Sequence, residues 1–301
     1  MVSSLLTLLR GFAMGCADVV PGVSGGTVAY IVGIYPRLLG AINSIGPTTV
    51  GQFFRGHWGQ LWRDIDGWFL LVLGCGIISA VLFFTRVVSI PALLVSHPHQ
   101  VYGLFFGLIV GSLLLLSREL GHHRLVDILW MGLGTLLGLA LVNLVPTQTP
   151  HTSLVVFLSG SVAITAMLLP GVSGSFILLM LHQYEYIFGA IGALRIAVIA
   201  PFAAGCLVGI LLFSRLLAWL LSTFGRQTRL IINGLLLGSL WAIWPFQHRE
   251  FRLIREKSRI ISSQPIWPAN YDQSVVMAFG LMLLGMVVVI VVGRVSRTQA
   301  R

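Results

Sequence analysis

The chain has 301 residues, of which 56% are hydrophobic and only 9% are charged. Soluble domains carry about 25% charged residues, so this composition excludes an ordinary soluble protein and predicts an all-α integral membrane protein. The formal net charge is +10. No basic, aromatic-rich soluble module is present to hold a nucleic acid, so we expect no nucleic-acid partner and expect the charge to orient the loops across the membrane.

An interrupted apolar stretch opens the chain, at residues 5–42. Its middle is the turn-forming sequence Pro21-Gly22-Val23-Ser24-Gly25-Gly26. Neither arm comfortably spans about 30 Å of hydrocarbon at about 1.5 Å per residue. The sequence therefore predicts a re-entrant helical hairpin that returns to its own side, with its turn surrounded by protein or by a water-filled cavity.

Three apolar segments follow a polar loop at 43–66. They are long enough for transmembrane helices and lie at about 67–86, 101–117 and 126–145. A polar, proline-containing joint follows the third segment. We place the end of a first repeat there, so that it covers residues 1–150.

The turn-forming sequence recurs 149 positions later, as Pro170-Gly171-Val172-Ser173-Gly174-Ser175. Tyr35 matches Tyr184 at the same offset. We therefore expect a second repeat at 151–301, consisting of a hairpin at 153–191 and helices at about 196–218, 230–246 and 274–293. With three crossings in each half, the second repeat is inverted relative to the first, as in secondary transporters whose sites lie at the repeat interface.

The distribution of basic residues predicts on which side of the membrane the two termini lie. This topology puts the N-terminus, the C-terminal tail and most basic loops on one side, which predicts cytoplasmic termini. The basic segment at 247–273 lies on the other side. Its arginines fall on one helical face and its apolar residues on another, so we expect an amphipathic helix on the membrane surface, or else a solvated helix.

Metal-binding patterns are not evident in the sequence. Cys16, Cys75 and Cys206 lie in apolar stretches without CxxC spacing. His97 and His99 flank a proline in a loop, which is a weak metal pattern. We expect no metal site and no cofactor.

The residues after each turn are candidates for binding an anion. They are Ser24, Gly25, Gly26 and Thr27 in the first hairpin and Ser173, Gly174 and Ser175 in the second. Each group begins a helix, where N–H groups lack partners, glycines allow close approach and hydroxyls add donors. Two such ends facing one another would hold a phosphate or a carboxylate. The alternative is a structural elbow whose N–H groups are satisfied by neighbouring helices.

Charged residues close to the hairpins are further candidates, because charge at membrane depth is costly. Arg37 is a candidate partner for the anion or for Asp18. Asp18 and Glu185 are candidates for carrying a proton that is coupled to transport. For each residue, the alternative is a position at the end of a helix, from which the side chain reaches the membrane surface.

The stretch Gly11-Phe-Ala-Met-Gly-Cys-Ala-Asp18-Val-Val-Pro21-Gly-Val-Ser-Gly-Gly-Thr27, followed by Gly33-Ile34-Tyr35, resembles the signature of a bacterial family of undecaprenyl (polyprenyl) phosphate translocases. The resemblance covers nearly the whole chain and includes the second turn. The family pattern has an acidic residue after the first tyrosine, where this chain has Pro36. Any proton coupling therefore depends on Glu185 or Asp18.

This resemblance implies a membrane carrier, not an enzyme. It would return undecaprenyl phosphate from the outer to the inner leaflet of the bacterial cytoplasmic membrane, for reuse in the synthesis of peptidoglycan and other envelope polymers. The phosphate would be shielded between the repeats, and the tail would stay in lipid. Two alternatives are a transporter or channel for a small soluble anion and a polyprenyl pyrophosphate phosphatase. The oligomeric state is not predicted.

Overall fold

The computed structural model describes residues 2–18, 24–88, 93, 96–120, 125–143, 149–254 and 257–298. Two groups of three helices form the segments that were predicted as hairpins. The first group is α1 (Val2–Asp18), α2 (Gly25–Ile31) and α3 (Tyr35–Asn43). The second is α10 (Ser153–Leu168), α11 (Gly174–Met180) and α12 (Tyr184–Gly192). The bounds of α11 and α12 lie 149 positions after those of α2 and α3, the same offset as in the sequence.

The first hairpin bends sharply between its two short helices, and the backbone turn at the bend has a counterpart in the second. The axes of α2 and α3 differ by 115°. At this bend Gly33 has a φ of +73°, and His182, at the matching place between α11 and α12, has a φ of +53°. A positive φ is natural for glycine and unusual for histidine. The same backbone turn is therefore made twice with different residues.

Within the described part of the chain, five long helices are apolar enough to cross a membrane. They are α6 (Gly67–Arg86), α8 (Pro98–Glu119), α9 (Leu125–Val142), α13 (Ile196–Thr223) and α15 (Gln273–Thr298). A sixth helix, α14 (Gly225–Ile243), begins with the polar sequence Gly225-Arg-Gln-Thr-Arg229. The predicted fold class, an all-α integral membrane protein, is confirmed. The five or six apolar helices agree with the prediction of about six transmembrane helices beside two hairpins.

Glycines bring the long helices together in pairs. A side chain at Gly111 of α8 would lie 2.8 Å from the carbonyl oxygen of Met286 in α15, and one at Gly238 of α14 would lie 2.7 Å from that of Thr135 in α9. Gly107 and Gly234, one turn earlier, face the backbones of α15 and α9 even more closely. Small residues allow such close packing in membranes. α8 thus pairs with α15, and α14 with α9.

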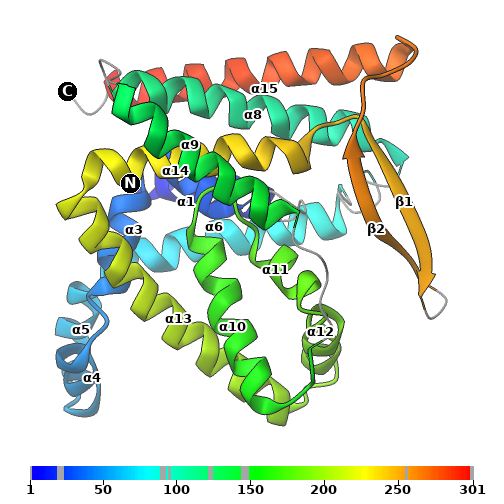
Figure 1. Cartoon of the computed structure of the whole chain (residues 1–301). Helices are drawn as coiled ribbons and strands as arrows, with labels where there is room; N and C mark the ends of the chain where they lie inside the picture. Colours follow the sequence, from blue (N-terminus) through cyan, green and yellow to red (C-terminus); the bar gives the residue numbers. More distant parts are fainter. Residues whose placement is uncertain are drawn as a thin grey trace.

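These helix pairs form the upper part of the molecule in Figure 1, where α8, α14 and α15 run side by side. α1 packs on α6, and α10 packs on α13. The first turn of α14 and the last turns of α15 lie on one side of this view, together with two short helices, α4 (Pro47–Phe54) and α5 (Trp58–Asp64). These two helices occupy part of the segment that the sequence indicated as a loop.

A β-hairpin extends from the opposite side in Figure 1. β1 (Gln247–Ile254) pairs antiparallel with β2 (Lys257–Pro265). The prediction of an amphipathic helix in this segment is therefore wrong. Backbone groups that a helix would satisfy internally are satisfied here between two strands, and the spacing of the arginines did not distinguish the two arrangements.

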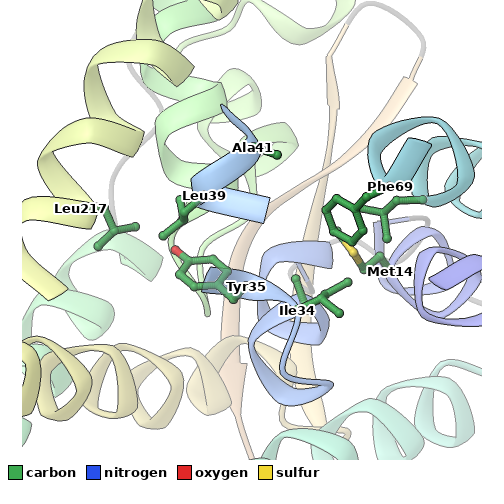
Figure 2. Packing of buried hydrophobic residues seen from close by; sticks show 9 residues of the cluster. Met14, Ile34, Tyr35, Leu39, Ala41, Phe69 and Leu217 are labelled. Atoms are coloured by element: carbon green, nitrogen blue, oxygen red, sulfur yellow. The ribbon is translucent and has the colours of Figure 1, made fainter. Parts of the chain in front are cut away.

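The core around the first hairpin is shown in Figure 2. Tyr35 and Leu39 of α3 lie beside Leu217 of α13, while Ile34 lies near Met14 of α1 and Phe69 of α6. Tyr35 is 1% exposed. The bent first hairpin is thus enclosed by helices from both halves of the chain.

Candidate functional site

The two hairpins meet directly. The Ser24 hydroxyl donates a hydrogen bond to the carbonyl of Met167 at 3.1 Å, and the Gly171 N–H donates one to the Thr27 hydroxyl oxygen at 2.8 Å. The Tyr35 hydroxyl donates a third, of 2.6 Å, to the carbonyl of Leu168. Groups freed by the break between α10 and α11 therefore find partners on α2 and α3, as buried backbone requires.

A cavity of about 300 Å³ lies beside this contact, and we call it the hairpin cavity. Its polar lining consists of Asp18, Ser24, Ser173, Gly174 and Ser175, all of which are residues predicted for the site. Its other lining residues are Ala163, Ile164, Met167, Leu178, Phe188, Ile191, Phe202 and Cys206. The structure thus brings together predicted residues from both hairpins, with an apolar wall from α10 to α13.

The start of α2 is closed by the protein itself. The Gly25 N–H donates to Asp18 Oδ1 at 2.7 Å, and the Gly26 N–H donates to the Ser24 hydroxyl at 3.2 Å. Thr27 is 1% exposed and holds Gly171. Gly26 and Thr27 do not line the cavity. In the first hairpin, therefore, the elbow alternative describes the backbone better than an open cradle does.

The start of α11 differs from that of α2. The Ser173 hydroxyl lies 2.8 Å from the Ser175 hydroxyl and caps no N–H of α11. Among the described residues, the Gly174 and Ser175 N–H groups donate no hydrogen bond. The residue matching Asp18 at the offset of 149 is Met167, which has no carboxylate. Donors on the second hairpin are therefore available to the cavity, while those on the first are occupied.

The mouth of the cavity is apolar. Three of its lining residues are also substantially exposed, namely Met167 (36%), Phe188 (49%) and Ile191 (42%). Neighbouring surfaces of α10 and α13 expose further large apolar side chains, such as Leu158 and Leu207. In a membrane protein such a surface faces lipid tails. The cavity is therefore bordered by an exposed apolar surface.

Arg37 and Glu185 lie outside the hairpin cavity. The Arg37 guanidinium binds both carboxylate oxygens of Asp66, at 2.6 and 3.1 Å, and lies 4.3 Å from the centre of the Phe69 ring. Glu185 is exposed in the first turn of α12. In this conformation Arg37 is held by Asp66, and neither residue is part of the cavity lining.

Sequence reasoning missed the apolar wall and Cys206. These residues come from four helices, and no spacing in the sequence indicates that they meet. The matched pair Tyr35 and Tyr184 was visible, but its use is not symmetrical, since only Tyr35 bonds across to the other hairpin, while Tyr184 stacks on Phe188.

Comparison with known proteins places the chain in a family. The model of the undecaprenyl phosphate translocase-like family matches residues 14–261. The polyprenyl-phosphate transporter of Vibrio cholerae serotype O1 is 40% identical over 243 residues, which cover 81% of this chain and 78% of that protein. The polyprenyl-phosphate transporter of Staphylococcus aureus is 30% identical over 261 residues, covering 80% of this chain and 86% of that protein. No solved structure matches. This chain belongs to the undecaprenyl phosphate translocase-like family.

Proposed function

We propose that this protein carries undecaprenyl phosphate, or a closely related polyprenyl phosphate, across the bacterial cytoplasmic membrane. The lipid would move from the outer to the inner leaflet and return to the synthesis of peptidoglycan and other envelope polymers. Two relatives are named polyprenyl-phosphate transporters, which fits a carrier that performs no chemistry on its substrate. The termini would be cytoplasmic, since most basic loops share their side.

The observation that carries this proposal is the mixed lining of the hairpin cavity. It includes the hydroxyls of Ser24, Ser173 and Ser175 and the exposed apolar side chains of Met167, Phe188 and Ile191. A polyprenyl phosphate has the same two parts, a small polar headgroup and a long apolar tail. We assign the headgroup to the serines and the first isoprene units to the mouth, with the remaining tail in lipid.

The donors for the phosphate come mainly from the second hairpin. Ser173, Gly174 and Ser175 offer hydroxyl and N–H groups that hold no other partner outside this trio among the described residues. Ser24 lines the cavity from the first hairpin with its hydroxyl hydrogen already donated to Met167, and Gly25, Gly26 and Thr27 shape the contact between the hairpins. Arg37 would take part only in another conformation, after leaving Asp66.

Coupling to protons follows from the charge that must be moved. A membrane potential that is negative inside opposes inward movement of an anion by about 2.3 kcal/mol per charge per 100 mV. A proton carried with each phosphate offsets one of these charges. Asp18, which lines the cavity, and Glu185, which lies on the exposed side of α12, are the two candidate carriers.

The test is lipid flipping in liposomes. Purified protein is reconstituted with a fluorescent short-chain polyprenyl phosphate, and the outer-leaflet pool is followed with an added quencher, with and without an inward proton gradient. We expect flipping that depends on the protein and falls when the gradient is collapsed. Empty liposomes and Ser173→Ala/Ser175→Ala protein are the controls. If folded protein flips no lipid under an imposed gradient, the proposal is wrong.

A soluble anion remains the second candidate, since the serines alone would suit free phosphate. The exposed apolar side chains that border the cavity favour the lipid. Uptake of labelled inorganic phosphate by the same liposomes separates the two. Assaying phosphate release from polyprenyl pyrophosphate in the same preparation tests the phosphatase alternative.

A further inference from the structure

We infer that Asp18 controls entry of the phosphate into the hairpin cavity, so that the substrate binds only when this carboxyl group carries a proton. The inference deepens the proposed function and rests on it. Asp18 would then determine the charge state in which the cavity accepts substrate. It would take no part in any chemical reaction of the lipid.

The position of the carboxylate is fixed. Asp18 is the last residue of α1, and its Oδ1 accepts the Gly25 N–H at 2.7 Å. A side chain at Gly25 would lie within 2.5–2.9 Å of Oδ1, Cγ and Oδ2, so the whole carboxyl group lies flat against this glycine. The group cannot swing away from the cavity without losing that hydrogen bond.

The charges around the cavity give Asp18 no compensation. Among the described residues, the lining holds one charged side chain, Asp18, and one other titratable group, the Cys206 thiol. Charged residues on the surrounding helices lie elsewhere and do not line the cavity; they are Arg10, Glu185, Arg195 and Arg215. Arg215 donates to the carbonyl of Ile45, and Arg195 lies over the ring of Tyr186.

A phosphate in this cavity would therefore meet a carboxylate at close range in surroundings of low polarity. Two negative charges repel one another strongly in such surroundings. The repulsion between phosphate and carboxylate falls when one of the two groups takes up a proton. The protonated carboxyl group would still accept from Gly25 and would gain an O–H that can donate to the phosphate. The residue matching Asp18 in the second hairpin is Met167, so one proton, not two, is linked to each binding event.

Cys206 supplies a direct readout of binding, since it lines the cavity and is half-buried. In a Cys16→Ala/Cys75→Ala background, the rate of Cys206 alkylation by a small maleimide is measured with and without farnesyl phosphate. The ratio of the two rates at each pH gives occupancy and cancels the titration of the thiol itself. Farnesol serves as the control for binding of the tail alone.

The decisive comparison is with Asp18→Asn, which keeps an acceptor for the Gly25 N–H but has no titrating group. We expect the wild-type affinity for farnesyl phosphate to fall as pH rises, by up to about tenfold per pH unit more than in Asp18→Asn. The titration of the phosphate itself, near pH ~6, is common to both proteins and cancels in this difference. Equal pH dependence in the two proteins would overturn the inference, as would a folded Asp18→Asn protein that binds at no pH.

A second measurement covers the case in which Asp18→Asn does not fold. Farnesyl sulfate, whose anion does not titrate near neutral pH, is bound to the wild-type protein in buffers of different ionisation enthalpy. Calorimetry then counts the protons taken up. We expect uptake approaching one proton per ligand in the pH range where affinity falls. Binding at unchanged affinity across that range, without proton uptake, would contradict the inference.

The outcomes also separate this inference from the proposed function. If farnesyl phosphate protects Cys206 with the same pH dependence in wild type and Asp18→Asn, the lipid substrate stands and the role of Asp18 falls. If inorganic phosphate protects Cys206 and farnesyl phosphate does not, the lipid substrate falls. The role of Asp18 is then judged from the pH dependence of phosphate protection in the same two proteins.

Discussion

The Tyr35 hydroxyl and the Leu168 carbonyl, 133 positions apart in the chain, form a buried hydrogen bond of 2.6 Å between the two hairpins. Leu168 ends α10, so its carbonyl is one that the break before α11 leaves without a helical partner. Tyr35 replaces that partner from the other half of the chain. The second break is therefore held in shape by the first hairpin.

Replacing Tyr35 by phenylalanine removes the hydroxyl and leaves this carbonyl unsatisfied. We expect Tyr35→Phe to destabilise the protein by about 1–2 kcal/mol. Tyr184→Phe is the matched control, because Tyr184 stacks on Phe188 and a phenyl ring preserves that contact. The measurement is thermal unfolding in detergent. An equal decrease in the melting temperature of the two variants would mean that the hydrogen bond between the hairpins makes no measurable contribution to stability.

Two glycines of α9 test the packing of α9 on α14. A side chain at Gly134 would lie 2.9 Å from backbone carbon atoms of Ile231, whereas one at Gly132 would meet nothing within 4 Å. We expect Gly134→Ala to cost about 1–3 kcal/mol, because the helices must separate. Gly132→Ala should be neutral or stabilising by up to about 1 kcal/mol, because alanine favours the helix. Midpoints of chemical unfolding in detergent distinguish them, and a neutral Gly134→Ala would contradict the close packing.

Two ion pairs differ in burial, which predicts different contributions to stability. Asp127, with 7% of its side chain exposed, binds Arg226 at 2.6 Å and joins α9 to α14. In the exposed pair, 37% of the Asp66 side chain is accessible beside Arg37. We expect Asp66→Asn to cost less than about 1 kcal/mol. Asp127→Asn should lower the melting temperature clearly more, since the half-buried Arg226 guanidinium then lacks the carboxylate charge that it binds.

Asp272 predicts a pH dependence at the start of α15. Its carboxylate accepts the Val275 N–H at 2.9 Å and the Ser274 hydroxyl at 3.0 Å, and these bonds lower the pKa of Asp272 below its usual value. A carboxyl group whose pKa is lower in the folded state than in the unfolded state stabilises the fold when the pH is above the unfolded-state pKa of about 3.9. This contribution is lost as the pH falls through the pKa of the folded state.

Asp272→Ala should therefore lower the melting temperature at pH ~7, and its difference from wild type should shrink below pH ~4. Asp272→Asn is the control, since it keeps an oxygen acceptor without a charge. A difference between wild type and Asp272→Ala that is constant from neutral to acid pH would contradict the role of the charge.

The serines at the start of α11 predict an effect on transport rather than on folding. Removing both hydroxyls, in Ser173→Ala/Ser175→Ala, should weaken substrate binding about tenfold or more, the usual effect of losing hydrogen bonds to a charged group. Ser161→Ala on α10, outside the hairpin cavity, is the control. Initial rates of lipid flipping against substrate concentration give the measurement. Unchanged apparent affinity in a folded double variant would remove these serines from the site.

Much of the helical architecture was predictable from composition and turns. Apolar length located the membrane helices, and α6 was predicted with both of its ends correct, at Gly67–Arg86. The spacing of the charged residues in 247–273 led to the wrong prediction of a helix. Side-chain spacing does not show whether backbone groups form hydrogen bonds within one segment or between two. The β-hairpin needed the second arrangement.

The site was predictable in part. The duplicated turn identified Ser24, Ser173, Gly174 and Ser175, because turn residues inside an apolar stretch have few structural explanations. Placing Asp18 in the cavity and Arg37 outside it required the tertiary structure. Which of two nearby charges an arginine meets depends on the direction of α3, and the sequence leaves that direction open.

The pairing of Asp18 with Met167 at equivalent places gives the two halves of the chain unlike binding faces. If the two halves are inverted repeats that exchange roles, as the sequence predicts, identical halves would give two access states of equal affinity. Here we expect unequal affinities, and by detailed balance the substrate must then shift the equilibrium between the states by the same ratio. A loaded carrier would dwell on one side of the membrane longer than an empty one, while the gradients alone would still decide the direction of net movement.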